Sequence, residues 1–128
     1  MVIGSLDTAI VVDLLRQYTP AQAWLNQLPR NDRLGVSPIV WLEVIDGVSN
    51  RQEQNTAIKL LGSFEWLDLT PDDCRWAVNQ AIKFKLSHNT DIEDCLIAST
   101  SHRLQIPLFT ANIKHFQPLI GPLAQKPY

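Results

Sequence analysis

Cysteine is scarce in this chain, and the marks of exported or membrane proteins are missing. The two cysteines, Cys74 and Cys95, form no CxxC pair and no tight cluster with histidine. This argues against a disulfide framework and a structural zinc site. No apolar run approaches the roughly 20 residues of a membrane span, and the N-terminus lacks the basic segment of a signal peptide. We therefore expect a cytoplasmic protein with reduced thiols.

Positive charge is not in excess either. The 11 lysines and arginines face 13 aspartates and glutamates, which gives a net charge of −2. Binding of nucleic acid through bulk positive charge alone is therefore ruled out, whereas a nuclease that touches few phosphates and works through metal ions is not. The chain has 128 residues, of which 45% are hydrophobic and 19% charged. With no linker, repeat or low-complexity stretch, we expect one globular domain over residues 1–128.

Short apolar runs alternate with longer segments of helical periodicity. Strands are expected over residues 2–6, 34–36, 66–69, 106–110 and 121–126. Helices are expected over residues 8–16, 19–28, 39–48, 51–64, 70–86 and 91–104, with a helical turn over 112–116. Thr8 and Thr19 are predicted N-caps, and Thr19 is followed by proline at the first helical position. Strands that alternate with helices predict a parallel sheet covered on both faces.

Acidic residues occur at a strand end and in apolar helical segments. Asp7 closes the first strand, so its side chain is expected at the carboxyl-end crevice where such folds bind ligands. Glu43 lies in a helical segment that is apolar nearly all round, and Asp94 begins another. Charges buried in such helices are costly unless they are paired or bound to metal. Asn112 follows the strand at 106–110 and completes the candidate set.

Carboxylates that converge in one crevice repel one another and partly protonate unless cations bind. An oxygen-only ligand set, without His or Cys, is typical of Mg²⁺ and Mn²⁺. Such ions lower the pKa of a bound water and stabilise charge on a phosphate during in-line attack. The pattern therefore indicates hydrolysis of a phosphodiester bond. Asp91 precedes Asp94 by one helical turn and shares its face of the helix.

Each of these residues also has a purely structural interpretation. Asp7 could cap the following helix, Glu43 could pair with a buried arginine, and Asp94 could interact with the helix dipole. Asp91 is more readily explained as a solvated or N-capping acid, and Asn112 as a helix cap. No single residue is specific, so the prediction depends on the joint pattern.

Histidines and tryptophans add little to the predicted site. His88 shares a polar loop with Asn89, and no pair of histidines has zinc-site spacing. His115 could contact phosphate or pack within the fold. The four tryptophans follow the spacing of core positions and are expected in the core: Trp24, Trp41, Trp66 and Trp76.

Four strings of residues together resemble one known family. They are Leu6-Asp7-Thr8, the helix that carries Glu43 and ends at Gly47, the string Asp94 to Ala98, and the string Phe109 to Phe116. In order and spacing they are similar to PIN-domain ribonucleases, above all to the VapC-type toxins of bacterial toxin–antitoxin pairs. The resemblance covers nearly the whole chain.

The resemblance implies a three-layer αβα sandwich with a central, mainly parallel sheet, and a Mg²⁺-dependent endoribonuclease. Its acidic positions correspond to Asp7, Glu43 and Asp94, with Asp7 and Asp94 holding the metal. The fourth position is often Asp in relatives and is Asn112 here, which removes one charge from the metal site. Ala9 also departs from the family pattern, because relatives often carry Asn or Ser there.

The resemblance also implies partners. They are an RNA substrate, a cognate VapB-like antitoxin that places a cation near the acids, and a second copy of the chain in a homodimer. Apolar residues of the early helices, such as Ile10, Leu14 and Trp41, are expected at the surface for these contacts, although the spacing of Trp41 is also that of a core position.

Two alternative functions are open at this point. A phosphoacceptor receiver domain has a similar size and class, and Thr110 and Lys126 match parts of its pattern. It requires an acidic pair where this chain has only Asp7, and its phosphoacceptor would be Asp68. The second alternative is a PIN-like scaffold that binds a partner without cleaving RNA, which retention of three acids disfavours.

Overall fold

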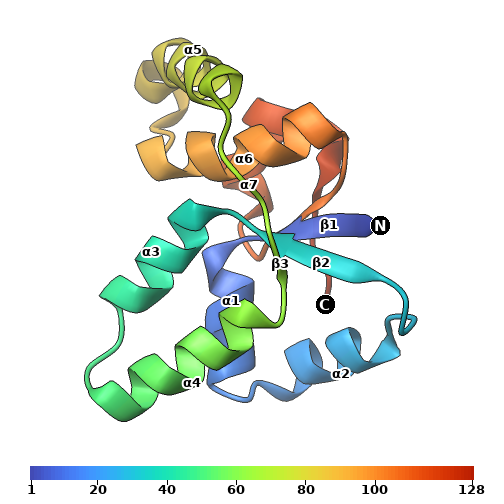
Figure 1. The fold of residues 1–128 in the computed structure, drawn as a ribbon. Coiled ribbons are helices and arrows are strands. Elements are labelled where there is room, and N and C mark those ends of the chain that lie inside the picture. The colour runs from blue at the N-terminus through green and yellow to red at the C-terminus, as the bar shows by residue number, and fades with distance from the viewer.

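The computed structural model describes all of residues 1–128 as a single α/β fold (Figure 1). Five strands form one sheet in the order β3-β2-β1-β4-β5, and every neighbouring pair is parallel. The strands are β1 (Val2–Leu6), β2 (Arg33–Val36), β3 (Glu65–Trp66), β4 (Leu108–Phe109) and β5 (Ala124–Gln125). The predicted α/β class with a parallel central sheet is confirmed.

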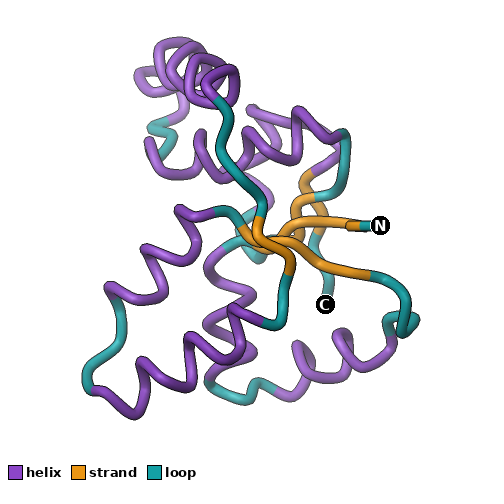
Figure 2. The backbone as a smooth tube through the Cα atoms, in the orientation of Figure 1, coloured by secondary structure: helices purple, strands orange, loops and turns teal.

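Seven α-helices cover the two faces of this sheet. They are α1 (Thr8–Leu15), α2 (Thr19–Gln27), α3 (Pro38–Asp46), α4 (Arg51–Gly62), α5 (Pro71–His88), α6 (Ile92–Leu104) and α7 (Ile113–Ile120), with a 3₁₀ turn η1 (Gly121–Leu123) before β5. One layer has α1 packed against α2, α3 and α4, and the other has α6 packed against α5 and α7. Figures 1 and 2 show these layers below and above the strands, with α5 outermost. None of the helices combines the length and apolarity needed to cross a bilayer.

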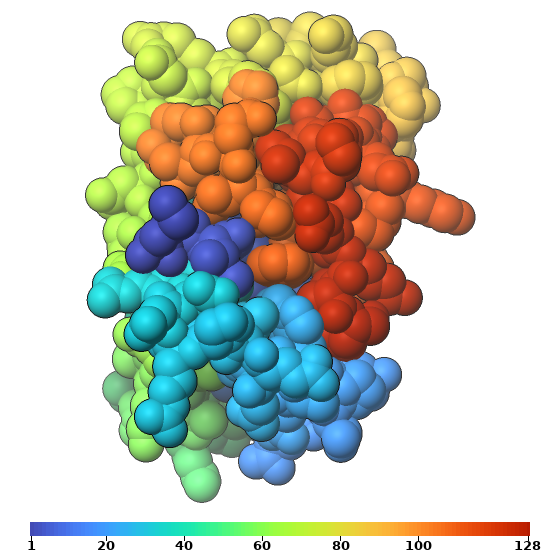
Figure 3. All heavy atoms as spheres, turned by 90° about the vertical axis from the view of Figure 1, so that its right-hand side faces the viewer, coloured from blue at the N-terminus to red at the C-terminus, as the bar shows by residue number.

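The central strand β1 lies between β2 and β4. The chain passes from β1 to β2 on one side and returns much later as β4 on the other, so the carboxyl ends of β1 and β4 form the topological switch point. Leu6 pairs in register with Phe109, and Asp7 and Thr110 therefore leave the sheet at the same point. Figure 3 views the opposite end, where the N-terminal residues in dark blue reach the surface between the two layers.

The core lies on both faces of the short sheet. Fully buried residues come from the strands and from both helical layers: Leu6, Ile10, Val36, Val40, Ile97, Leu108 and Phe116. Close packing requires glycine in β2, because a Cβ atom at Gly35 would lie 2.6 Å from the side chain of Leu67. The sheet and helices are thus held by apolar contacts on both sides.

Several predicted element boundaries differ from the structure. The N-cap of α1 is Asp7, not Thr8, and the N-cap of α2 is Tyr18, not Thr19. The strand expected at 66–69 is shorter and starts one residue earlier, as β3. The helical turn expected at 112–116 is the longer helix α7, which continues through Pro118 because its apolar residues at helical spacing pack into the core.

The burial of two groups of apolar residues was also predicted wrongly. Ile10 and Leu14, expected at the surface, are buried on the side of α1 that faces the sheet. Trp66, expected in the core, is 53% exposed and lies against the half-buried ring of Trp41, 5.8 Å between centres. Both differences arise because periodicity indicates which residues share a face but not which face is covered.

An ion pair between a buried aspartate and a partly exposed arginine anchors α5 to α6. Asp73 is 2% exposed and accepts two hydrogen bonds from Nε of Arg103, at 3.0 and 3.1 Å. The same carboxylate completes a capping box with Thr70 at the start of α5. Acids in the first turn stabilise a helix start, and here one of them also links α5 to the next helix along the chain, through residues 30 positions apart.

Candidate metal centre and active site

Asp7 is fixed at the switch point by its neighbours in space. Its Oδ1 accepts the backbone N–H of Thr8 at 2.7 Å, and its Oδ2 accepts the hydroxyl of Thr110 at 2.8 Å. The Thr110 hydroxyl in turn accepts the backbone N–H of Asn112 at 2.9 Å. Asp7 is 5% exposed and Thr110 is fully buried. Asp7 therefore both caps α1 and presents a carboxylate of fixed orientation to the crevice.

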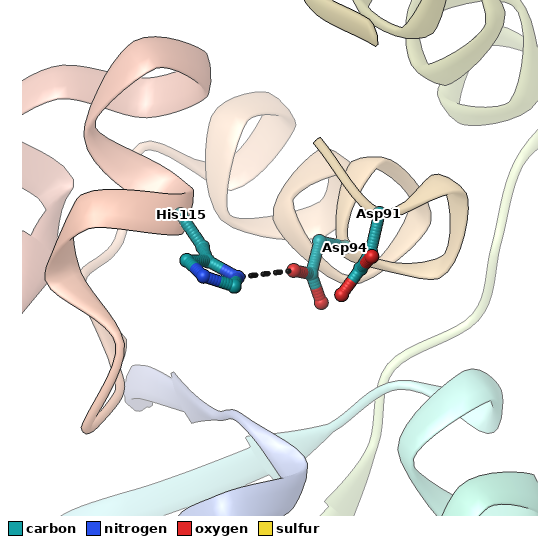
Figure 4. A group of neighbouring side chains, drawn as sticks. All are labelled: Asp91, Asp94 and His115. Atoms are coloured by element: carbon teal, nitrogen blue, oxygen red, sulfur yellow. Dashed lines mark ion pairs between the residues drawn. The ribbon is translucent and has the colours of Figure 1, made fainter. Parts of the chain in front are cut away.

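Asp94 approaches the crevice from the first turn of α6. Its Oδ2 lies 3.5 Å from Nδ1 of His115 on α7, and one ligand atom from each of Asp91, Asp94 and His115 lies within 4.8 Å of the others. Figure 4 shows Asp91 and Asp94 side by side, with His115 pointing toward Asp94. Asp91 is the N-cap residue of α6, although its side chain makes no capping hydrogen bond.

Glu43 lies on α3, is exposed, and is near enough for its charge to act on Asp7. Its Oε1 accepts the hydroxyl of Thr8 at 2.6 Å. The expectation that Glu43 is buried is therefore wrong, as is the alternative of a buried arginine partner. The apolar residues of α3 that face the core are Val40 and Val44, and Glu43 lies beside this buried face and not within it. Thr8, the residue that follows Asp7, thus links Glu43 to the start of α1.

Asn112 begins α7 directly after the Thr110 turn. It is the N-cap residue of α7, as the cap interpretation expects, although its side chain is exposed and makes no capping hydrogen bond. Its carbonyl accepts the backbone N–H of His115 at 3.0 Å. The structure therefore places the Asn112 side chain near this edge of the sheet without engaging it in the fold.

Burial and mutual repulsion perturb the two inner acids. Burial raises the pKa of Asp7 above its ordinary value, and the charge of Glu43 adds to this, while the hydrogen bonds from Thr110 and Thr8 oppose it. The pKa of Asp94 rises to about 7, first because of burial and then because of the charges of Asp7 and Asp91, with His115 opposing. These carboxylates would ionise fully only beside a cation.

The donor set fits a hard divalent cation. Carboxylate oxygens are the ligands that Mg²⁺ and Mn²⁺ prefer, and the acids gather where the strands end. His115 lies in this group, although no pattern in the sequence joined it to Asp94. The sequence feature that could have indicated His115 is its position shortly after β4, in the first turn of α7. His88, by contrast, hydrogen-bonds to Ser87 and packs against Phe84.

A sequence model of the PIN domain matches residues 5–117. The chain belongs to the PIN-domain family. This PIN domain is 32% identical over 126 residues to Ribonuclease VapC19 of Mycobacterium tuberculosis, covering 96% of this chain and 98% of the relative. The family resemblance predicted from its motifs is thereby confirmed.

Solved structures of similar proteins agree with the assignment. VapBC-1 from nontypeable Haemophilus influenzae has 27% identity and a TM-score of 0.79, over 99% of this chain and 98% of that one. VapBC2 from Rickettsia felis, bound to a DNA fragment from its promoter, has 26% identity and a TM-score of 0.75, over 96% and 95%. The three-layer PIN fold is confirmed, and the receiver-domain alternative has no support.

Proposed function

We propose that this PIN domain is a Mg²⁺-dependent endoribonuclease that hydrolyses RNA phosphodiester bonds at the crevice, with Mn²⁺ able to substitute. The observation that carries the proposal is the convergence of acids at the switch point, where the charge of Asp7 contributes to raising the pKa of Asp94 to about 7. Carboxylates held so close together need a cation to stay ionised. The identity to a ribonuclease supports RNA as the substrate.

Asp7 and Asp94 are the proposed metal ligands. When bound, the ion would lower the pKa of the attacking water and neutralise negative charge on the phosphate. Hydrogen bonds from Thr8 and Thr110 keep the carboxylate of Asp7 in one orientation. This fixed orientation reduces the reorganisation needed when the site is loaded.

Glu43 and Asn112 complete the proposed catalytic set. Glu43, held by the Thr8 hydroxyl, orients the attacking water and takes up its proton as the new bond to phosphorus forms. The bond from phosphorus to the leaving oxygen then breaks, and that oxygen takes a proton from solvent water. Asn112 has a free amide side chain and is assigned to hold a water molecule at the crevice.

The test is cleavage of RNA by purified variants in Mg²⁺ and in EDTA. Asp7→Asn and Asp94→Asn each remove ligand charge but keep shape, so we expect cleavage to fall at least about 100-fold, as is typical when a charge-stabilising group is lost. Asp46→Asn, on the exposed end of α3, is the matched control and should keep full activity. Full activity of Asp94→Asn would contradict the metal assignment. A folded wild-type protein that cleaves no RNA would favour the inactive-scaffold alternative.

The proposed partner is a cognate VapB-like antitoxin. A groove of about 450 Å³ between α1, α3 and α4 supports this, because Val12, Leu15 and Val48 line it and Glu43 lies at its edge. An apolar segment in this groove would bring a neighbouring Arg or Lys to the acids. The similarity to VapBC complexes agrees with such a partner.

Sequencing the gene immediately upstream and co-expressing any short reading frame found there together test the partner. We expect co-purification and suppressed RNA cleavage. Val12→Asp should weaken capture, whereas Ile58→Asp should not, because Ile58 is equally exposed, 45% against 44%, but lies outside the groove. Undiminished cleavage by the purified complex would contradict inhibition.

A homodimer is also proposed on the family resemblance. Because Ile10 and Leu14 are buried, the contact must use other residues. Val78, Ile82 and Leu86 are 58%, 75% and 99% exposed and recur every four residues on the outermost helix α5, which gives an apolar stripe of one helical face. Sedimentation at micromolar concentration should detect a dimer that Ile82→Lys dissociates, and a strict wild-type monomer would contradict the proposal.

A further inference from the structure

A second pocket lies beside the crevice, between the side of α1 and the residues that follow β4 and β5. Its volume is about 250 Å³, and Ile10 and Ala111 are among the residues that line it. Ile10 lies three residues after Asp7, and Ala111 directly precedes Asn112. One end of the pocket therefore adjoins the candidate active site, although none of its lining residues belongs to the proposed catalytic set.

The other end combines two cations with two aromatic rings. The guanidinium of Arg16 lies 4.8 Å from the centre of the Tyr18 ring, and the rings of Tyr18 and Tyr128 are 6.0 Å apart and tilted by 57°. Asp13 fixes this arrangement, because its carboxylate accepts Nε of Arg16 at 2.9 Å and the hydroxyl of Tyr128 at 2.6 Å. Lys126 lines the same pocket and forms no ion pair.

Arg16 and Lys126 bring two cations to this pocket, although the whole chain carries a net charge of −2. Asp13 pairs with Arg16, which leaves Lys126 as the cation without an ion pair. Lys126 is exposed and Tyr18 is 41% exposed, so both are accessible to a ligand. The pocket thus offers an accessible cation and an accessible aromatic ring that Asp13 and Arg16 hold in place.

We propose that this pocket binds one nucleotide of the RNA strand that is cleaved at the crevice, an inference that rests on the proposed ribonuclease function. The ring of Tyr18 and the plane of the Arg16 guanidinium are stacking surfaces for a base. The ammonium of Lys126 is a contact for a backbone phosphate. Pockets for drug-sized ligands measure about 300–1,000 Å³, so a volume of about 250 Å³ suits a single base.

The position along α1 agrees with a strand that continues from the crevice. Asp7 caps the N-terminus of this eight-residue helix and Arg16 caps its C-terminus. At about 1.5 Å per residue the helix is about 12 Å long, a length that a few nucleotides span. The pocket therefore positions the strand through a nucleotide outside the scissile bond, and it contributes to binding and not to the chemical step.

Steady-state kinetics on an oligoribonucleotide that the wild-type protein cleaves test this inference. Loss of one stacking surface predicts that Tyr18→Ala raises KM by about 5- to 100-fold with kcat within about twofold. Tyr18→Phe keeps the ring and should retain the wild-type KM. Lys126→Gln should raise KM and reduce the slope of log KM against log salt by about 0.7, as for one phosphate contact on a single strand. Lys59→Gln, an exposed lysine on α4, is the control for loss of charge.

Three results would overturn the subsite. If Tyr18→Ala and Lys126→Gln both cleave RNA with the KM of the wild-type protein, the subsite is wrong while the ribonuclease function stands. If these two variants lose only the binding of a protein partner, the pocket is a contact for that protein and not for RNA. If the wild-type protein cleaves no RNA, fluorescence anisotropy with a labelled single-stranded oligoribonucleotide decides the question, because equal affinity of the wild-type protein and Tyr18→Ala overturns the subsite as well. Circular dichroism verifies that the variants are folded.

Discussion

Replacing Asp94 with asparagine should stabilise the metal-free protein, and the gain should depend on pH. The pKa of Asp94 is raised from its ordinary value of 3.8 to about 7 in the folded chain. A raised pKa means that the folded state binds the proton more tightly than the unfolded state does. The stability that this group contributes is therefore present at pH below about 4 and is lost as the pH rises through 7.

The size of the effect follows from the same values. A rise from 3.8 to about 7 corresponds to at most about 4 kcal/mol lost at pH 8, and to less than half of that at pH 5. The asparagine side chain of the variant cannot ionise, so it escapes this penalty, but it gives up the favourable interaction of an acid with the N-terminus of α6, about 0.3–1 kcal/mol. Relaxation around the coupled acids reduces the gain further. We expect Asp94→Asn to raise the free energy of unfolding by about 1–3 kcal/mol at pH 8.

Urea denaturation in EDTA at pH 5 and pH 8 measures this difference. The gain of Asp94→Asn over wild type should be clearly larger at pH 8. Addition of Mg²⁺ should stabilise the wild-type protein and not the variant, because a ligand that binds only the folded state raises its stability. A variant less stable than wild type at pH 8 in EDTA, or an equal gain at both pH values, would refute the repulsion argument.

Three further substitutions test other parts of the structure. Asp91→Asn should change stability by no more than about 0.3–1 kcal/mol in urea denaturation and leave RNA cleavage intact; a large loss of activity restored by Mn²⁺ would show that Asp91 supplies the charge missing at Asn112. Thr110→Val removes the hydroxyl that orients Asp7 and should cost about 1–3 kcal/mol of stability and lower cleavage, with Thr110→Ser restoring both. Asp73→Ala leaves Arg103 without its buried partner and should cost about 2–4 kcal/mol by thermal or urea unfolding, against no more than about 1 kcal/mol for Asp72→Ala in an exposed pair. Equal losses in the last two variants would contradict the anchoring role of Asp73.

Local residue patterns were sufficient to predict most of the elements and the order of the acidic residues. Alternation of apolar runs with helical periodicity predicted a parallel sheet between helical layers, because that pattern is dictated by which residues must avoid water. The position of Asp7 after a strand and of Asp94 in an apolar helix predicted a common crevice. The position of Asp7 follows from the rule that parallel strands end at one edge of the sheet, and that of Asp94 from the cost of leaving a charge unpaired in an apolar helix.

Tertiary structure alone decided how the site is held together. The hydrogen bond between Thr110 and Asp7 joins residues 103 positions apart, and the contact of His115 with Asp94 joins two helices. Glu43 is exposed because α3 turns Val40 and Val44 toward the core, and Arg16, Tyr18 and Lys126 share one pocket because α1 passes the end of β5. Such contacts depend on which faces pack together, and local periodicity carries no information about the partner across an interface. The sequence by itself therefore determined the layers of the fold and the identity of the acidic residues. Packing decided which side chains contact those acids.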